Sequence, residues 1–247
     1  MITRRRLLFT AGAGVLGVTV LNTVAACSSA DSSPDRAGDP VESPAAAVPS
    51  AAGPATGWRR VEMAIVSAYL LVRGTEVAVV DLGETGSLQA IESGLKAAGS
   101  GWADVRHIIL THQHPDHVGG LAEVAPKVKA TVYAGEADVG SILSDKPLKP
   151  VKDGDEVFGL RIIGTPGHTL GHVSVYDPST KTLVAGDALR TTSGLEGSDP
   201  QYTADPLDAA ASVRKLAALD IGAILPGHGD PLTSNANDAL RKLAATL

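Results

Sequence analysis

The run Thr-His-Gln-His-Pro-Asp-His at positions 111–117 limits what this chain can fold into more than any other feature of the sequence. It holds three of the seven histidines of the chain and follows the apolar segment 105–110. A short apolar run of this kind predicts a buried strand that ends at the run. In extended backbone, residues i and i+2 face the same side, so His112 and His114 can reach one metal ion.

Asp116 and His117 follow Pro115, which bends the chain, and they can therefore face a second ion close by. Neutral imidazole and carboxylate groups suit zinc. A solvated polar loop is the alternative interpretation, but so dense a cluster in a chain with few histidines favours a metal site.

The chain is predicted to have three parts. Residues 1–26 carry Arg4, Arg5 and Arg6 before an uncharged, mostly apolar stretch, which predicts an export signal. Residues 27–57 are rich in Ser, Pro, Ala and Gly and predict a flexible linker, because they offer too little apolar surface to offset their ordering entropy. Residues 58–247 are the predicted folded domain, which carries the run 111–117.

The end of the first segment, Val24-Ala25-Ala26-Cys27, resembles a bacterial lipobox, and its start resembles a twin-arginine signal. We therefore expect an exported lipoprotein, anchored outside the cytoplasm through Cys27, or a secreted protein. An uncleaved membrane anchor and an ordinary secretory signal are the alternatives. Cys27 is the single cysteine, which excludes an internal disulfide framework and a cysteine-rich zinc site.

The charge of the chain restricts its partners. Asp and Glu number 27 against 21 Lys and Arg, and three of the arginines lie in the predicted export signal. An acidic domain without a basic stripe is a poor nucleic-acid binder. We expect a small-molecule substrate, no nucleic acid, and membrane contact only through the N-terminal lipid anchor; the sequence leaves the oligomeric state open.

Apolar periodicity predicts alternating strands and helices across the domain. The expected strands cover 61–72 and 75–81 (as a hairpin about Arg73-Gly74), 105–110, 131–134, 159–164, 173–176, 182–185 and 221–225. The expected helices cover 87–98, 119–124, 206–219 and 235–245. Several strands end at a His or Asp, so functional loops should gather at one edge, and we expect loops 143–156 and 188–206 to wall the pocket.

The run 111–117 resembles the Thr-His-x-His-x-Asp-His signature of the metallo-β-lactamase-fold superfamily, in its glyoxalase-II and lactonase-like branch. Further segments resemble later and earlier pieces of that family, in its order: Val80-Asp81-Leu82-Gly83, Gly167-His168-Thr169, Gly186-Asp187 and Pro226-Gly227-His228-Gly229. The resemblance implies an α/β (α+β) fold, a four-layer αββα sandwich with the site at one edge of two sheets.

The resemblance also implies a ligand set for two Zn²⁺ ions, with Fe or Mn as the alternative metals. The first ion would be held by His112, His114 and His168. The second ion would be held by Asp116, His117 and His228. Asp187 would bridge the two ions.

Two adjacent ions can lower the pKa of a shared water and stabilise the attacking and leaving oxygens. We therefore expect a binuclear zinc hydrolase whose metal-bridging hydroxide attacks an ester, thioester, lactone or amide carbonyl. Asp116 is expected to help move the proton.

Four further side chains are weaker candidates. His172 is expected to orient a ligand or contact substrate, or to be a supporting residue without a direct role. Tyr202 falls where related lactone hydrolases place a substrate-polarising tyrosine; the alternative is a surface residue. Asp81 is either a hydrogen-bond partner of the metal loop or a turn residue, and His107 is expected to be structural.

Three alternative functions stay open. A β-lactam hydrolase would suit an exported protein, although the main zinc β-lactamases usually have Cys or Ser where this chain has Asp187. A mononuclear iron persulfide oxygenase and a non-catalytic metal-binding lipoprotein are the others. A glutathione thioesterase is disfavoured, because Arg241 and Lys242 are the only basic residues after His228.

Overall fold

The computed structural model describes residues 57–247. The predicted export signal and linker, including Cys27, therefore lie outside the described residues. Within the described part, no helix combines the length and apolar character that crossing a membrane requires.

The first half of the domain is built on a six-stranded sheet in the order β1-β2-β3-β4-β5-β6. Its strands β1 to β3 are antiparallel, and β3 to β6 run parallel to one another. The strand bounds are β1 Gly57–Glu62, β2 Ser67–Arg73, β3 Glu76–Val80, β4 Val105–Leu110, β5 Thr131–Gly135 and β6 Leu148–Val151. The carboxyl ends of β3, β4 and β5 therefore meet at one edge.

The second half is built on a five-stranded sheet in the order β13-β10-β9-β8-β7. All neighbours are antiparallel except β10 and β13, so β8, β10 and β13 end at the same edge. The bounds are β7 Glu156–Val157, β8 Leu160–Gly164, β9 Val173–Asp177, β10 Thr182–Gly186 and β13 Ala223–Pro226, with a small separate pair, β11 Leu189–Arg190 and β12 Glu196–Gly197.

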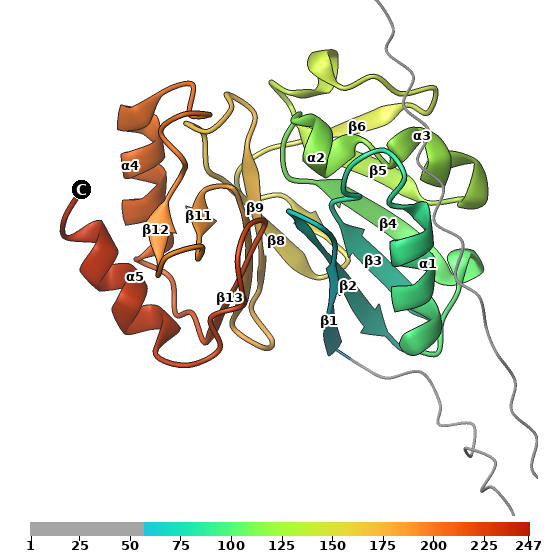
Figure 1. The fold of residues 1–247 in the computed structure, drawn as a ribbon, viewed down its shortest axis with the longest axis horizontal. Coiled ribbons are helices and arrows are strands. Elements are labelled where there is room, and N and C mark those ends of the chain that lie inside the picture. Colours follow the sequence, from blue (N-terminus) through green and yellow to red (C-terminus); the bar gives the residue numbers. More distant parts are fainter. Residues whose placement is uncertain (1–56) are drawn as a thin grey trace, which may run out of the picture. The chain divides into compact units, whose positions relative to one another are not determined.

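Helices cover the outer face of each sheet (Figure 1). On the first sheet lie α1 Leu88–Ala97, α2 Pro115–Val118 and α3 Leu121–Val124, with short 3₁₀ turns at Trp102–Asp104, Ala125–Lys127 and Val139–Ser141. On the second sheet lie α4 Pro206–Leu216 and α5 Ala236–Ala244. The side chain of Asp205 caps α4 by accepting hydrogen bonds from the backbone N–H groups of Leu207 and Asp208.

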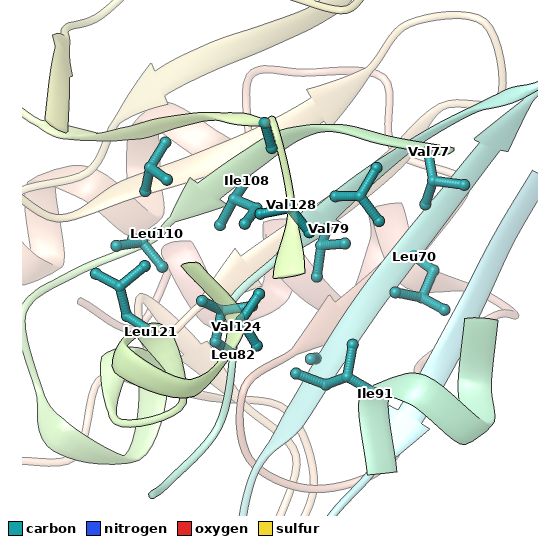
Figure 2. Close-up of a cluster of buried hydrophobic side chains, with 14 of the residues drawn as sticks. Leu70, Val77, Val79, Leu82, Ile91, Ile108, Leu110, Leu121, Val124 and Val128 are labelled. Atoms are coloured by element: carbon teal, nitrogen blue, oxygen red, sulfur yellow. The ribbon is translucent and has the colours of Figure 1, made fainter. Parts of the chain in front are cut away.

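Three buried clusters separate four layers, which confirms the predicted αββα sandwich. One lies between the first sheet and its helices, where Leu70, Val79 and Ile91 meet (Figure 2). A second cluster lies between the sheets, and a third lies under α4 and α5. Val, Leu, Ile and Ala dominate all three clusters, in line with the 3% aromatic content.

Most predicted elements are present, with shifted ends. The expected continuous strand 61–72 is wrong: Met63–Val66 forms a turn between β1 and β2, because these strands pair with each other. The expected helix 119–124 is shorter, because α3 begins only at Leu121. Gly119 and Gly120, where an added Cβ would meet backbone oxygens at 2.4 Å, separate it from the preceding helical turn α2. Strands β6, β7, β11 and β12 have no counterpart in the sequence prediction.

Candidate metal centre

The two sheets bring their functional strand ends together at one edge of the sandwich. After β4, the chain carries the run 111–117. His168 follows β8, Asp187 directly follows β10, and His228 follows β13. Each of these strands is buried, so the ligand side chains project from a rigid support.

The first ligand group joins His112, His114 and His168. Nδ1 of His114 lies 3.1 Å from Nε2 of His112 and 2.9 Å from Nε2 of His168. Three imidazole nitrogens therefore converge on one point, an arrangement that a single cation satisfies.

The second ligand group joins Asp116, His117 and His228. Oδ2 of Asp116 lies 3.2 Å from Nε2 of His228 and 3.6 Å from Nε2 of His117. The group thus combines one carboxylate with two imidazoles, which suits zinc, iron or manganese.

Asp187 lies between the two groups. Its Oδ2 atom is 3.4 Å from Nε2 of His168 and 3.2 Å from Nε2 of His228, and its Oδ1 atom is 3.2 Å from Nε2 of His117. One carboxylate therefore faces both groups at once, as expected for a bridging ligand.

The outer nitrogen of four ligand imidazoles is held by the protein. Thr111 Oγ1 donates to Asp81, so His112 Nδ1 must donate to Thr111. Nδ1 of His117 donates to Asp81 Oδ2 at 2.8 Å, and Nδ1 of His228 donates to the carbonyl of Ile65 at 2.6 Å. Each hydrogen bond fixes the tautomer that leaves Nε2 free for a metal.

A hydroxyl chain orients His168 in the same way. Thr203 Oγ1 donates to the carbonyl of Asp199, so Ser198 Oγ must donate to Thr203 and accept from His168 Nδ1 at 2.8 Å. The Nε2 atom of His168 therefore also presents a lone pair to the first group.

Two buried ligand atoms show that these residues fit bound cations. Within residues 57–247, Nε2 of His117 and Oδ1 of Asp187 have no hydrogen-bond partner. Leaving such atoms unsatisfied is costly in a protein interior. Both atoms face the second group, where a divalent ion would supply the missing partner.

The two groups differ in their proton affinity before any metal binds. In the first group, burial lowers the pKa of His168 to about 4 and holds that of His112 well below its usual value. In the second group, hydrogen bonds to Asp116 and Asp187 raise the pKa of His228 to about 10. Burial lowers the pKa of His117, but the charges of Asp187 and Asp81 outweigh this and raise it well above the usual value.

Asp81 is the hydrogen-bond partner of the metal loop. Its carboxylate accepts from the backbone N–H of Thr111 at 2.7 Å, from the Thr111 hydroxyl at 2.8 Å and from Nδ1 of His117. The residue has φ of 62°, a conformation that non-glycine residues rarely adopt, so it is held there by its contacts.

His172 is fully buried behind Asp187. Its Nε2 accepts the backbone N–H of Asp187 at 3.0 Å, and its Nδ1 therefore donates to Thr165 Oγ1 at 2.8 Å. With both nitrogens occupied, the ring orients the bridging residue; burial lowers its pKa to about 3, so it stays neutral.

Beside the first group lies an open cavity of about 440 Å³. It is lined by Gln113, His114, Ala137, Asp138, Ser141, His168, Thr169, Leu170 and Gln201–Ala204. Tyr202 lies on its rim and is 59% exposed. Loop 188–206 thus forms one wall as expected, whereas the lining contains no residue of loop 143–156, which was expected to form the other wall.

The structure brings all seven predicted ligand residues to one place. His107 lies away from it, with its ring centroid 5.0 Å from that of Phe158. Sequence reasoning missed Asp138, Ser198 and the Ile65 carbonyl. A backbone carbonyl leaves no trace in side-chain patterns, and single Asp or Ser residues in loops carry no distinguishing motif.

Comparison with known proteins identifies the family. Residues 64–228 match the metallo-beta-lactamase superfamily. The probable metallo-hydrolase YflN of Bacillus subtilis is 29% identical over 255 residues, which covers 83% of this chain and 97% of that protein. The hydroxyacylglutathione hydrolase of Brucella anthropi is 36% identical over 156 residues, covering 61% of this chain and only 56% of that enzyme.

Among solved structures, TTHA1623 in a di-iron-bound form is 28% identical with a TM-score of 0.59. The match covers 74% of this chain and 95% of that protein. The chain therefore belongs to the metallo-beta-lactamase superfamily and is a metal-dependent hydrolase with a His- and Asp-rich metal centre.

Proposed function

We propose that the chain is a binuclear zinc hydrolase that cleaves an uncharged ester, thioester, lactone or amide. The position of Asp187, whose two carboxylate oxygens face both ligand groups, carries this proposal. A protein that only sequesters a metal has no need for a carboxylate shared between two groups.

Two bound ions would lower the pKa of a water and polarise the substrate carbonyl. Asp81 and His172 hold the ligands around that position, from behind His117 and from behind Asp187 respectively. Asp116 is half-buried and its pKa is lowered chiefly through its hydrogen bond with His228, which outweighs the effect of burial, so its carboxylate stays ionised. This carboxylate could accept the proton that such a water would lose.

The cavity beside the first group favours an uncharged substrate. None of the residues that line it is Lys or Arg, and its carboxylate, Asp138, is turned toward internal donors. Leu170 and Tyr202 expose apolar surface there, with Leu170 71% exposed. A glutathione thioester carries carboxylates that would find no cationic partner, so this substrate is disfavoured. Tyr202 is the candidate to donate a hydrogen bond from its phenol to the substrate oxygen.

We infer that the enzyme acts outside the cytoplasm, as a lipoprotein attached through Cys27. Cells supplied with a labelled fatty acid should incorporate the label into the full chain, and Cys27→Ala should abolish the incorporation. A membrane-bound wild-type chain without label would refute lipid anchoring and favour an uncleaved anchor.

Metal content and turnover of the purified protein test the function together. About two zinc ions per chain, with hydrolysis of neutral esters or lactones, would support the proposal. One iron ion per chain, together with persulfide oxidation, would support the iron oxygenase instead of the zinc hydrolase. Iron is included in the metal analysis because TTHA1623 has been seen in a di-iron-bound form. If the protein binds metal but turns over no neutral, anionic or β-lactam substrate, the non-catalytic metal-binding lipoprotein remains as the interpretation.

A further inference from the structure

Asp138 is a buried carboxylate at the metal centre that is not among the seven ligands. It lies in the turn after β5, with 1% of its surface exposed, and its backbone N–H donates to the carbonyl of Gly135 at 2.9 Å. Because β5 runs parallel to β4, this turn lies beside the loop that carries His112 and His114.

The carboxylate of Asp138 joins the two loops that supply the first ligand group. Oδ2 accepts from the backbone N–H of Gln113 at 3.0 Å and from the Thr169 hydroxyl at 2.6 Å, and Oδ1 accepts from the backbone N–H of Gly171 at 2.7 Å. Gln113 stands between His112 and His114, and Thr169 directly follows His168. One side chain is therefore bonded next to all three ligands.

Close backbone packing makes this connection stiff. A Cβ on Gly135 would lie 1.8 Å from the carbonyl oxygen of Gly171. A Cβ on Gly171 would lie 2.4 Å from the backbone nitrogen of Asp138 and 2.6 Å from its Oδ1. The turn and the His168 loop meet without side chains between them, so a shift of Asp138 moves the loop.

The chemistry of the three donors points to a positioning role. All three are neutral, and among the described ion pairs none includes Asp138. Burying a carboxylate without a cationic partner is costly. An Asn at this position would have only one acceptor oxygen for three donors, whereas the carboxylate has two. Three converging donors, two from one loop and one from the other, need an acceptor with two free oxygens.

We propose that Asp138 is a positioning residue that sets the distance between the His112–His114 loop and His168, and thereby the affinity of the first ligand group for its ion. This role of Asp138 concerns metal binding and does not depend on which bond the enzyme cleaves.

The test compares Asp138→Asn with Asp177→Asn. Asp177 is a matched control: it is also buried, accepts from Trp58 Nε1 and Ser179 Oγ, and pairs with Arg73, but it lies at the opposite end of β9 from His172. For each variant, Zn²⁺ affinity is measured by competition with a chelator, together with the melting temperature of metal-free protein and the absorption spectrum of the Co²⁺ form.

Asp138→Asn places an NH₂ group against a donor. It should weaken the binding of the ion at the first group by about 10- to 100-fold, whichever of the two ions binds more tightly. Its Co²⁺ spectrum should also change. Asp177→Asn should lower the melting temperature while leaving affinity and spectrum unchanged. Equal Zn²⁺ affinity in wild type and Asp138→Asn, or equal losses in both variants, would overturn the proposal.

A milder variant covers the case in which Asp138→Asn does not fold. Thr169→Val removes one donor, keeps the side-chain volume and leaves the other two hydrogen bonds in place. It should weaken Zn²⁺ binding by about 5-fold, the value of one ordinary hydrogen bond. No loss of affinity in Thr169→Val would contradict the role of this connection. Because no substrate is used, failure of the hydrolase proposal would leave these results intact.

Discussion

The two halves of the sandwich contribute to the metal centre in different ways. The first half supplies four ligands within one short loop after β4, and Asp81 accepts three hydrogen bonds from that loop. The second half supplies His168, Asp187 and His228 from three separate strand ends. Each of these has its own support: a hydroxyl, an imidazole and a backbone carbonyl.

Loss of the shared support in the first half should disturb several ligands together, whereas loss of a support in the second half should disturb one. Asp187 is the exception in the second half, because both ligand groups contact it.

Asp187→Ala is therefore expected to have the largest effect. Among residues 57–247, it removes the one carboxylate that faces both groups, and it leaves His117 and His228 with one acidic neighbour fewer. We expect turnover to fall by about 10³-fold or more and metal content to drop below that of the wild type. Elemental analysis and steady-state kinetics measure both; unchanged metal content and turnover would rule out the two-ion site.

Asp81→Ala comes next and tests the shared support. It leaves the backbone and hydroxyl donors of Thr111 and Nδ1 of His117 without their acceptor in a buried place. We expect a loss of about 3 kcal/mol in the free energy of unfolding and weaker binding of both ions. Chemical denaturation and chelator competition check this.

His172→Ala is the matching change in the second half. It removes one acceptor, for the N–H of Asp187, so it should lower turnover by about 10-fold. Because Asp187 faces both groups, both ions should bind more weakly, but by less than in Asp81→Ala. An effect as large and as broad as that of Asp81→Ala would contradict the proposed contrast between the halves.

The pH dependence of metal binding separates the two ligand groups. Near pH 7 His168, with a pKa of about 4, is already neutral, whereas His228, with a pKa of about 10, carries a proton that an ion must displace. Between pH 6 and 9, affinity at the second group should rise by about tenfold per unit for each proton released. Affinity at the first group should change less over this window, because the pKa values of His168 and His112 are lowered.

Calorimetry in buffers of different ionisation enthalpy counts the protons directly. We expect filling the second group to release more protons than filling the first. Equal proton release for both ions would show that the two groups do not differ in this way.

The same contrast explains what the sequence reveals about this site. The four ligands of the first half lie close together along the chain, so the run 111–117 predicts a metal site from spacing alone. His168, Asp187 and His228 were assigned through resemblance to a family, because isolated His and Asp residues have no informative spacing.

The supports are harder to predict than the ligands. Asp138 meets Gln113 and Gly171 only because β5 pairs in parallel with β4 and the two sheets pack face to face. Strands β6 and β7 were missed for a related reason: they are short edge strands at the margins of the sheets, where alternation of apolar residues is weak.

Ser198→Ala is expected to have the smallest effect and tests the contrast most finely. The serine accepts a hydrogen bond from Nδ1 of His168 and donates one to Thr203, a chain that keeps Nε2 of His168 free. Since water can replace a half-buried hydroxyl, we expect the affinity of the first ion to fall by only about 5-fold, with the second ion unaffected. Chelator competition measures both affinities. Equal weakening of the two ions would mean that supports in the second half act jointly, as Asp81 does in the first.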